Sequence, residues 1–371
     1  MERQPEDDEM KHGLANRGNW AKLKQVMARA EAGETLNIGF LGGSITQGSL
    51  SSTPQTCYAY LVYDWWCKAF PKAKFNYING GIGGTTSHFG GARAWSDVLM
   101  YRPDVVVVDF TVNDDATEFF EETFEGLIRR LLQAPSAPAL VIMNNVCYDT
   151  GVNAQAYHNR IGAHYGIPCV SMKDSIYAAM EAGELVRGEL TPDDLHPNDK
   201  GHALVAGQIT ALLEEVKADW KNPETAAEFP APLTENAYEA SARLQIQDNC
   251  AQLKGFMADT VEKKGIWDNF RNGWTAEQVG DSIVFELECS CLAVQYRKSV
   301  EQPVPVAAAV IDGDEANAVV LDGNFDQTWG DCLYLEPLLH HGEKKMHRLE
   351  IRVTDAQNVV RPFYLVSVIY A

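Results

Sequence analysis

The sequence predicts an α/β domain with a doubly wound parallel sheet, followed by a second domain of short β-strands. Three observations predict this order. Apolar runs of strand length alternate with segments of helical period through the first 220 residues, which is typical of a parallel sheet with helices on both faces. Residues 104–110 form a nearly continuous β-branched run, as in a strand buried on both faces. Beyond residue 235 the helical period disappears.

The elements of the first domain follow from the spacing of their apolar residues. Residues 17–33 carry apolar side chains at helical spacing and end at Gly33. Residues 58–70 are apolar nearly all round, which predicts a buried helix that Pro71 stops. The other predicted helices cover 92–101, 117–132, 153–165 and 199–220. The predicted strands begin near Asn37 and continue with 75–78, 104–110, 140–143 and 168–171.

A change of composition separates the two domains. Residues 221–235 are rich in Pro, Ala, Glu and Thr and have no period, which indicates a linker. We therefore expect a catalytic domain over 1–220 and a β-sandwich of jelly-roll type over 236–371. The expected strands of the second domain are 282–288, 293–297, 306–311, 318–321, 347–353 and 363–370.

Charge and hydropathy exclude several classes of partner. The formal net charge of the 371 residues is -20, which argues against nucleic acid and anionic membranes because phosphates would be repelled. No run of 18 apolar residues exists, so we expect no segment that spans a bilayer. The first ten residues are acidic and polar and lack an apolar signal region, which predicts a cytoplasmic protein.

The cysteines and histidines predict no metal site and no cofactor. Eight cysteines are too sparse for a disulfide scaffold, so reduced thiols are expected. Cys289 and Cys291 lie two apart in an expected strand; a metal pair is the less favoured alternative, because no second pair follows. His340 and His341 are not expected to bind a metal, because no carboxylate cluster accompanies them.

A serine follows the first predicted strand on a glycine turn. Gly42 and Gly43 allow the backbone to turn sharply and would expose Ser44 for chemistry. The alternatives are a plain turn or a loop that holds a phosphate. The phosphate loop is disfavoured because the pattern is not Gly-x-Gly-x-x-Gly and no lysine follows.

Other polar residues supply what a serine nucleophile needs, namely a base, a group that orients the base, and oxyanion donors. Asp193 and His196 lie three apart in one loop, so the carboxylate could reach the near ring nitrogen. The N–H groups of Ser44 and Gly84 and the amide of Asn113 would be the oxyanion donors. The separate alternatives are an acidic helix start, a flexible turn and a helix cap. All these groups follow predicted strands, where doubly wound folds bind ligands.

Four blocks resemble the SGNH (GDSL-type) hydrolase superfamily: Gly42–Ile45, Gly80–Ser87, Val112–Asp114 and Asp193–Asn198. The match covers roughly residues 35–215 and keeps the order of the blocks. The resemblance implies a flavodoxin-like fold in which Ser44 is the nucleophile and Asp193 and His196 complete the triad. It also implies that Gly84 and Asn113 complete the oxyanion hole with the N–H of Ser44.

Two positions depart from the pattern of that superfamily. Gly43 replaces the usual aspartate before the serine, and Thr111 replaces the usual glycine before Val112. Neither change removes a reacting group, so we expect altered loop geometry with the chemistry retained. Gly84 is chosen over Gly83 as a matter of register, and Asp193 is chosen over Asp194 because it keeps the spacing of the superfamily.

The two-domain plan resembles bacterial acetylesterases that act on acetylated mannan or xylan fragments. The chain lacks a long apolar lid, and the second domain resembles carbohydrate-binding modules. Trp267, Trp274 and Trp329 lie near turns and could stack on sugar rings, although each alone fits core packing. Trp329 is the expected substrate contact, because its loop, 324–331, is polar and flanked by glycine.

An acetylated oligosaccharide is therefore the expected partner. One alternative function is a lipase or thioesterase type of acyl hydrolase. Another is a sugar-binding protein on a vestigial hydrolase fold, which the intact set of four blocks disfavours. The oligomeric state stays open, with a homodimer among the alternatives.

Overall fold

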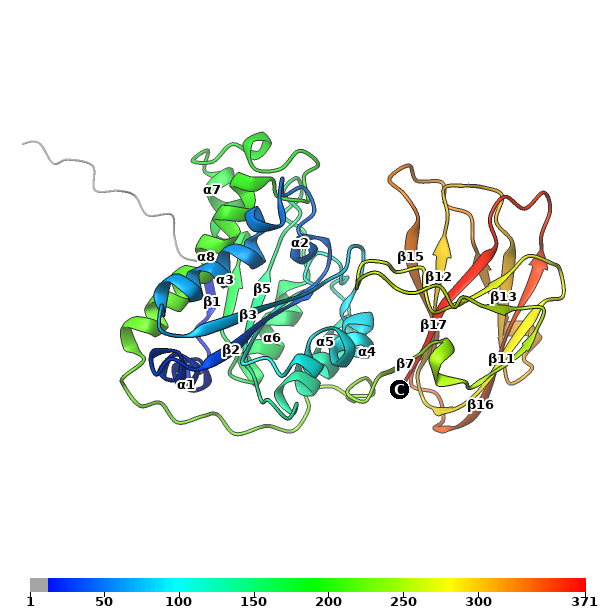
Figure 1. The fold of residues 1–371 in the computed structure, drawn as a ribbon, viewed down its shortest axis with the longest axis horizontal. Coiled ribbons are helices and arrows are strands. Elements are labelled where there is room, and N and C mark those ends of the chain that lie inside the picture. The colour runs from blue at the N-terminus through cyan, green and yellow to red at the C-terminus, as the bar shows by residue number, and fades with distance from the viewer. Residues whose placement is uncertain (1–12) are drawn as a thin grey trace, which may run out of the picture. The chain divides into compact units, whose positions relative to one another are not determined.

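The computed structural model describes residues 13–371 (Figure 1). Residues 1–12, at the start of the predicted catalytic domain, lie outside the described part. The chain forms two compact units. The first comprises the residues up to Gly90 and Ala94–Asn236, and the second comprises Gly91–Arg93 and Ala237–Ala371. Each unit is described by itself.

The described part of the first unit contains a six-stranded sheet in the order β1-β6-β5-β4-β2-β3. The strands β2 to β6 pair in parallel, and β1 pairs antiparallel with β6 at the edge. Their bounds are β1 (Leu14–Asn16), β2 (Thr35–Gly42), β3 (Lys74–Gly81), β4 (Val105–Asp109), β5 (Ala139–Asn144) and β6 (Cys169–Ser171). The parallel strands have the flavodoxin-like order 2-1-3-4-5, which confirms the predicted doubly wound fold.

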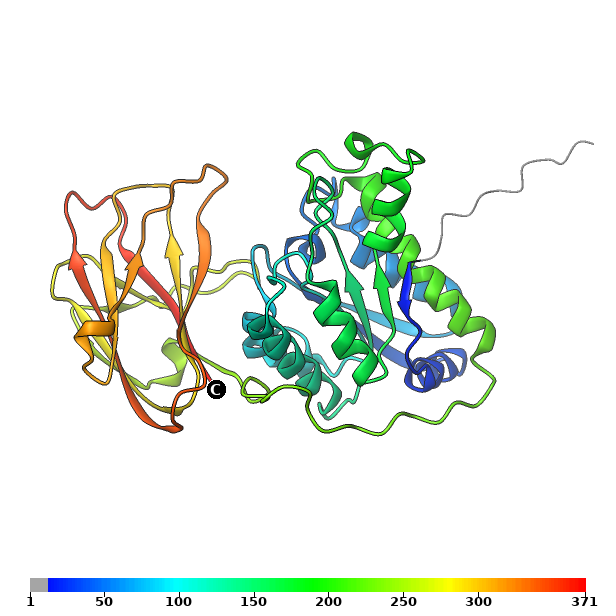
Figure 2. The ribbon, with the colours of Figure 1, turned by 180° about the vertical axis from the view of Figure 1, so that it is seen from behind.

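Helices cover both faces of this sheet, as Figure 2 shows from behind. Alternate residues of β4 face opposite sides. Val105 and Val107 pack in one apolar cluster with α1, α3 and α8, whereas Val106 and Val108 pack in another with α4, α5 and α6. The bounds are α1 (Ala21–Glu31), α3 (Tyr58–Ala69), α4 (Ser87–Asp97), α5 (Glu118–Leu132), α6 (Gln155–His164) and α8 (Asp199–Asp219). The short helices are α2 (Ser44–Gln47) and α7 (Ala178–Glu181).

The predicted helix 92–101 is wrong at its start, because α4 begins at Ser87. The carboxylate of Asp114 accepts the backbone N–H of Ser87, which satisfies a donor of the first turn. The helix tolerates Gly90 because the ring of Phe110 lies against it; a Cβ there would come within 2.6 Å of the ring. A 3-10 turn over Leu99–Tyr101 continues the chain after the helix.

The second unit is a sandwich of two antiparallel sheets, which confirms the predicted β-sandwich. One sheet has the order β15-β12-β17-β10-β9, with β7 also paired to β17, and the other has the order β14-β13-β16-β11-β8. Both sheets contribute to one apolar core, in which the rings of Trp274 and Phe285 meet edge to face, with 5.4 Å between their centroids.

The six predicted strands of this unit are present with small changes at their ends: β11 (Ser282–Cys289), β12 (Leu292–Lys298), β13 (Val306–Ile311), β14 (Val319–Asp322), β16 (Lys345–Asp355) and β17 (Phe363–Tyr370). Five further strands were not predicted, since most are short and the longest contains Pro337. They are β7 (Ala242–Leu244), β8 (Ala251–Lys254), β9 (Met257–Ala258), β10 (Trp274–Ala276) and β15 (Cys332–Leu339).

The predicted linker, 221–235, has no helix or strand but is anchored on the first unit. The buried carboxylate of Glu125 accepts the backbone N–H of Leu233 at 2.6 Å and of Thr234 at 2.8 Å. Glu224 accepts the N–H of Trp20 and forms an ion pair with Lys24. These contacts make the segment part of the first unit.

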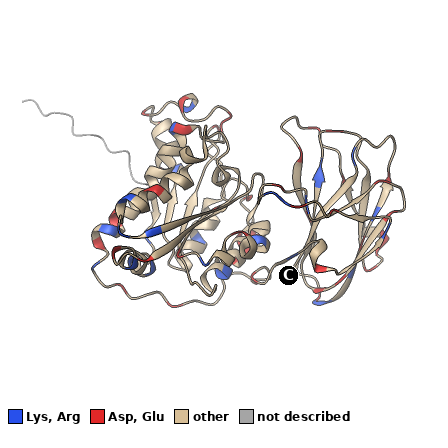
Figure 3. Ribbon diagram, in the orientation of Figure 1, with Lys and Arg blue, Asp and Glu red and all other residues tan. Residues whose placement is uncertain are grey.

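Charged residues occur along the helices and strands of both units (Figure 3). Among residues 13–371, no helix is both long enough and apolar enough to cross a membrane. All eight cysteines lie in the described part, and each is a free thiol.

Candidate active site

Ser44 begins α2 immediately after β2, at the carboxyl edge of the sheet. The two preceding glycines are needed for close approach. A Cβ on Gly42 would collide with Oγ1 of Thr46, and a Cβ on Gly43 would collide with Oδ1 of Asn113. The turn therefore brings Ser44 beside the end of β4, at the point where the strand order reverses and doubly wound folds bind ligands.

Ser44, His196 and Asp193 form a continuous hydrogen-bonded chain. Nε2 of His196 lies 2.8 Å from Oγ of Ser44, and Nδ1 lies 2.7 Å from Oδ2 of Asp193. Burial acts to raise the pKa of Asp193, but hydrogen bonds from the His196 ring and from backbone N–H groups outweigh it, so the pKa lies below its ordinary value. An ionised Asp193 accepts a hydrogen bond from Nδ1–H of His196. The unprotonated Nε2 is then free to accept a hydrogen bond from the serine hydroxyl.

The loop before α8 fixes which aspartate orients the base. Oδ1 of Asp193 accepts the backbone N–H of His196 at 2.7 Å. Asp194, the next residue, has a φ of 65° and pairs instead with Arg187 at 3.1 Å. Its carbonyl accepts the N–H of Tyr148. The structure therefore brings Asp193 to His196 and directs Asp194 elsewhere.

The glycine loop after β3 holds one occupied and one open N–H. The N–H of Gly83 donates to Oε1 of Gln47 at 2.6 Å. Gly84 has a φ of +67° and no atom within 4 Å of its Cβ direction. Within residues 13–371, no acceptor faces the N–H of Gly84. This arrangement favours Gly84 over Gly83 as the oxyanion donor.

Gln47 is a site residue that the sequence reasoning missed. Its side chain is exposed at the end of α2, three residues after Ser44, and it holds the N–H of Gly83. The only signal in the sequence is its helical spacing from the serine, which by itself names no partner.

The loop after β4 presents Asn113 beside the serine turn. The N–H groups of Asn113 and Asp114 both donate to the carbonyl of Phe110 at 2.9 Å. Thr111, one of the two residues that depart from the superfamily pattern, donates to Oδ1 of Asn144 at 3.1 Å and ties this loop to the end of β5. The departure therefore adds an anchor without removing a reacting group.

The first turn of α8, which follows His196, is hydrogen-bonded to the loop that follows Ser44. Asp199 accepts the N–H and the hydroxyl of Ser52 at 2.8 and 2.6 Å, and the hydroxyl of Thr56 at 2.7 Å. These hydrogen bonds lower the pKa of Asp199 to about 2. The ring of His202 accepts the N–H of Tyr58 through Nδ1 at 3.3 Å and donates through Nε2 to the carbonyl of Ser49 at 3.2 Å.

The remaining candidate residues belong to the second unit. Trp329 is 64% exposed, and its ring meets the ring of Phe325 edge to face at 5.1 Å. Trp267 is 65% exposed, whereas Trp274 is buried in the sandwich core. Trp329 therefore stays the predicted substrate contact, and Trp274 follows the core-packing alternative.

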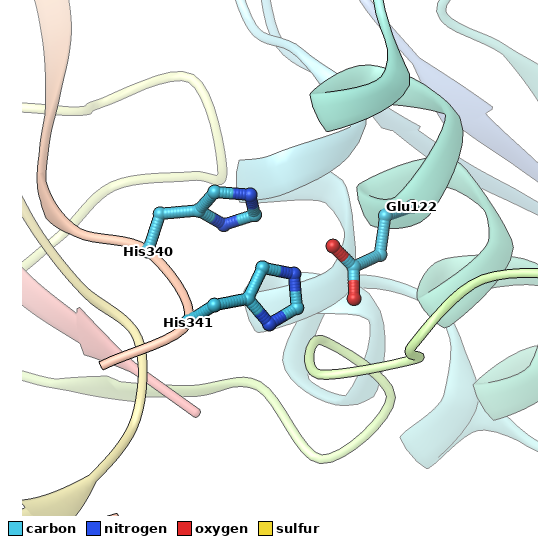
Figure 4. Close-up of side chains that lie close together, drawn as sticks. All are labelled: Glu122, His340 and His341. Atoms are coloured by element: carbon cyan, nitrogen blue, oxygen red, sulfur yellow. The ribbon is translucent and has the colours of Figure 1, made fainter. Parts of the chain in front are cut away.

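Figure 4 shows His340 and His341, which the sequence does not predict to bind a metal, together with a glutamate. His340 and His341 come from the loop after β15, and Glu122 comes from α5. Because the histidines and the glutamate belong to different units, no metal site is assigned to them.

Ser44, His196 and Asp193 lie at the carboxyl edge of a flavodoxin-like sheet, with open N–H and amide donors beside them. This arrangement is that of a serine hydrolase. The chain belongs to the GDSL-like lipase/acylhydrolase family, whose model matches residues 40–204.

Two solved structures that the chain is similar to are described as two-domain esterases. The chain is similar to a two-domain esterase active on acetylated mannans, with 54% identity, 97% of each chain covered and a TM-score of 0.95. A structure of such an esterase co-crystallised with mannopentaose matches with 54% identity, coverage of 97% of this chain and 96% of that chain, and a TM-score of 0.94. An acetylxylan esterase of Xylanibacter ruminicola is 24% identical over 54% of this chain. The chain spans about half of that relative's length, 47%.

Proposed function

We propose that this protein is a serine esterase that removes O-acetyl groups from acetylated mannan or xylan fragments through an acyl-enzyme on Ser44. The observation that carries the proposal is the hydrogen-bonded chain from Ser44 Oγ through His196 to Asp193. The 54% identity over nearly the whole chain to an esterase active on acetylated mannans supports the substrate class.

Acylation begins when Nε2 of His196 takes the hydroxyl proton as Ser44 Oγ attacks the acetyl carbonyl carbon. The carbonyl π electrons move to the oxygen, and this oxyanion receives hydrogen bonds from the N–H groups of Ser44 and Gly84 and from the Asn113 amide. Collapse of the intermediate breaks the ester C–O bond. His196 returns the proton to the departing sugar oxygen and leaves acetyl on Ser44.

Deacylation repeats these steps with water as the nucleophile. His196 takes a proton from a water molecule as the water oxygen attacks the carbonyl carbon of the acetyl-serine. The same donors form hydrogen bonds to the second oxyanion. Release of acetate returns the proton to Ser44 Oγ. Asp193 keeps its charge throughout and stabilises the imidazolium form of His196.

Mannan fragments are favoured over xylan fragments by the degree of similarity. The mannan-active relative shares 54% identity over 97% of the chain, whereas the acetylxylan esterase shares 24% over 54%. The sandwich unit and the exposed ring of Trp329 support a saccharide over a lipid acyl chain as the ligand. A lipase or thioesterase activity is the alternative that the assay must separate.

The test is mass spectrometry of acetylated manno- and xylo-oligosaccharides before and after incubation, with wild type and Ser44→Ala. The wild type should remove 42-Da acetyl increments, and Ser44→Ala should lose on the order of 10³-fold or more in kcat, as triad serines do. Ser290→Ala, a change in the sandwich, is the matched control and should retain activity. Wild-type turnover by Ser44→Ala would overturn the proposal. Preference for long-chain acyl esters would favour the lipase alternative.

We further propose that the enzyme works in the cytoplasm on short imported oligosaccharides. The free state of all eight cysteines supports a reducing compartment. Fractionation of the source cells tests this; recovery of the protein from a secreted or periplasmic fraction would contradict it.

A further inference from the structure

A carboxylic acid lies buried directly beneath the serine turn and has no part in the mechanism above. Asp109, the last residue of β4, is 2% exposed. Its backbone carbonyl accepts the N–H of Gly43 at 3.2 Å. Its Oδ2 accepts the hydroxyl of Thr46 at 3.2 Å and the amide of Asn145 at 3.1 Å. Asp109 thereby contacts the residues on both sides of Ser44.

No cation balances this group within the described residues. Asp109 forms no ion pair there, and its Oδ1 is buried without a hydrogen-bond partner. A buried carboxylate with two neutral donors and no counter-charge is costly, and such a group binds a proton instead. Burial raises the pKa of Asp109 to about 7; the hydrogen bonds from Asn145 and Thr46 oppose this rise, and the charge of Asp114 adds to it.

We propose that Asp109 is a positioning residue that supports the serine turn as a neutral acid, and that loss of its proton lowers ester turnover. The inference rests on the proposed role of Ser44. A negative charge on Asp109 would lie beneath the turn whose N–H groups must stabilise a second negative charge, the oxyanion. Like charges repel strongly at a site that excludes water.

Three titratable groups around Asp109 keep their charge in this range. Cys57, Tyr58 and Tyr148 surround it, and burial raises the pKa of each, in Cys57 to about 11. These three groups therefore stay neutral near pH 7 to 9. Asp114 accepts the N–H of Ser87 and pairs with His158, whose ring stacks on Phe124.

The first test compares kcat on acetylated mannooligosaccharide at pH 7 and pH 9. Wild-type kcat should fall as Asp109 ionises. In Asp109→Asn, which has the same shape and cannot ionise, the ratio of kcat at pH 9 to kcat at pH 7 should exceed the wild-type ratio by about fivefold or more. Asp109→Ala should lower kcat at both pH values, and the asparagine should rescue it. Asp64→Asn, at a partly exposed aspartate of α3 that pairs with Lys68, should keep the wild-type ratio.

The second test needs no substrate. The pKa of Asp109 is higher in the folded protein than its ordinary value, so its stabilising contribution is complete below about pH 4 and is lost as the pH rises through about 7. The urea midpoint of wild type should therefore fall relative to that of Asp109→Asn between pH 5 and pH 8. Parallel midpoints in the two proteins would overturn the proposal.

The outcomes separate this inference from the proposed function. Equal ratios of kcat in wild type and Asp109→Asn, with normal turnover at pH 7, would overturn the inference and leave the esterase standing. Absence of turnover in wild type would overturn the esterase, and the urea measurement would still decide whether Asp109 holds a proton.

Discussion

Gly43 has no side chain because the amide of Asn113 occupies the space that a Cβ would need. The superfamily that the sequence resembles usually has an aspartate at this position, whereas the glycine here permits close contact between the serine turn and Asn113. Gly43→Ala should push Asn113 away from the oxyanion. We expect kcat to fall on the order of 10²–10³-fold, as it does when one oxyanion donor is lost, with KM little changed.

A double variant makes this residue-scale prediction specific. If Gly43→Ala acts through Asn113, then Gly43→Ala with Asn113→Ala should be no worse than Asn113→Ala alone, because the two changes remove one interaction. Gly207→Ala, in α8 with no atom near the added Cβ, is the control and should leave kcat unchanged. Additive losses would mean that Gly43 matters for another reason.

The structure brings together Ser44, His196 and Asp193, which the sequence predicts as reacting residues, and their types and spacing explain why they could be chosen. Asp193 and His196 lie in one loop, and Ser44 and Asn113 each follow a strand. Gln47 and Asp109 could not be found in this way. Their roles depend on which atoms face them, the N–H of Gly83 and the hydroxyl of Thr46, and no local pattern encodes those neighbours.

At the scale of elements, the start of α8 is hydrogen-bonded to the loop between α2 and α3 and to the start of α3. His202 is buried, and its Nδ1 must be unprotonated to accept the N–H of Tyr58. Burial lowers the pKa of His202, and the nearby His196 acts in the same direction, against the carbonyl of Ser49 and the carboxylate of Asp199. The folded protein therefore binds this proton less readily than the unfolded chain does.

The sign of the pH dependence follows from this difference. The stabilising contribution of neutral His202 is complete above the ordinary histidine pKa of about 6.5 and is lost as the pH falls below it. His202→Gln should lower the free energy of unfolding by about 1–3 kcal/mol at pH 7, because the buried N–H of Tyr58 loses its hydrogen-bond acceptor. The fall in wild-type stability from pH 7 to pH 5 should be smaller in the variant.

Urea unfolding at the two pH values measures both effects. Gly207→Ala, on the same helix and with no atom near the added Cβ, is the control and should keep the pH dependence of the wild type. If the free energy of unfolding changes equally between pH 7 and pH 5 in wild type and His202→Gln, the ring of His202 is not held neutral in the folded protein.

Elements were predictable where apolar period and length agreed, as in α5 and β17. They were missed where tertiary contacts decide the structure. The strand β1 has three residues and exists through pairing with β6. The π-helical turn Lys173–Tyr177 begins where Asp174 N–H meets the hydroxyl of Ser171. The start of α4 depends on Asp114, which lies 27 residues further along the chain.

At the scale of the whole molecule, two units of different class occur in one chain, and the chain passes from the first to the second between Asn236 and Ala237, just after the irregular segment 221–235. The sequence could not show that 221–235 is held on the first unit, since its anchors Glu125 and Lys24 lie in distant helices and Trp20 directly precedes one. An irregular composition predicted the lack of secondary structure and left the attachment undetermined.

The sandwich unit presents Trp329 from a loop whose two ends are fixed. Asn324 donates to the carbonyl of Val304 at 3.0 Å, and Asp331 accepts the hydroxyl of Ser299 at 2.8 Å. The ring is exposed between these anchors, with Phe325 against its side. A fixed, exposed indole loses little conformational freedom when a sugar ring stacks on it, which is the property that a saccharide platform needs.

Trp329→Ala should therefore weaken the binding of the mannooligosaccharides proposed above as substrates. Part of an indole face is worth about 1.4 kcal/mol when covered, which corresponds to about tenfold in Kd. Calorimetric titration of mannopentaose into the full chain, with Ser44→Ala as the background, measures the change. Trp267→Ala removes an equally exposed tryptophan from the same unit and should bind as the background does. If both variants bind alike, the ring of Trp329 is no platform and the saccharide contacts lie on other residues.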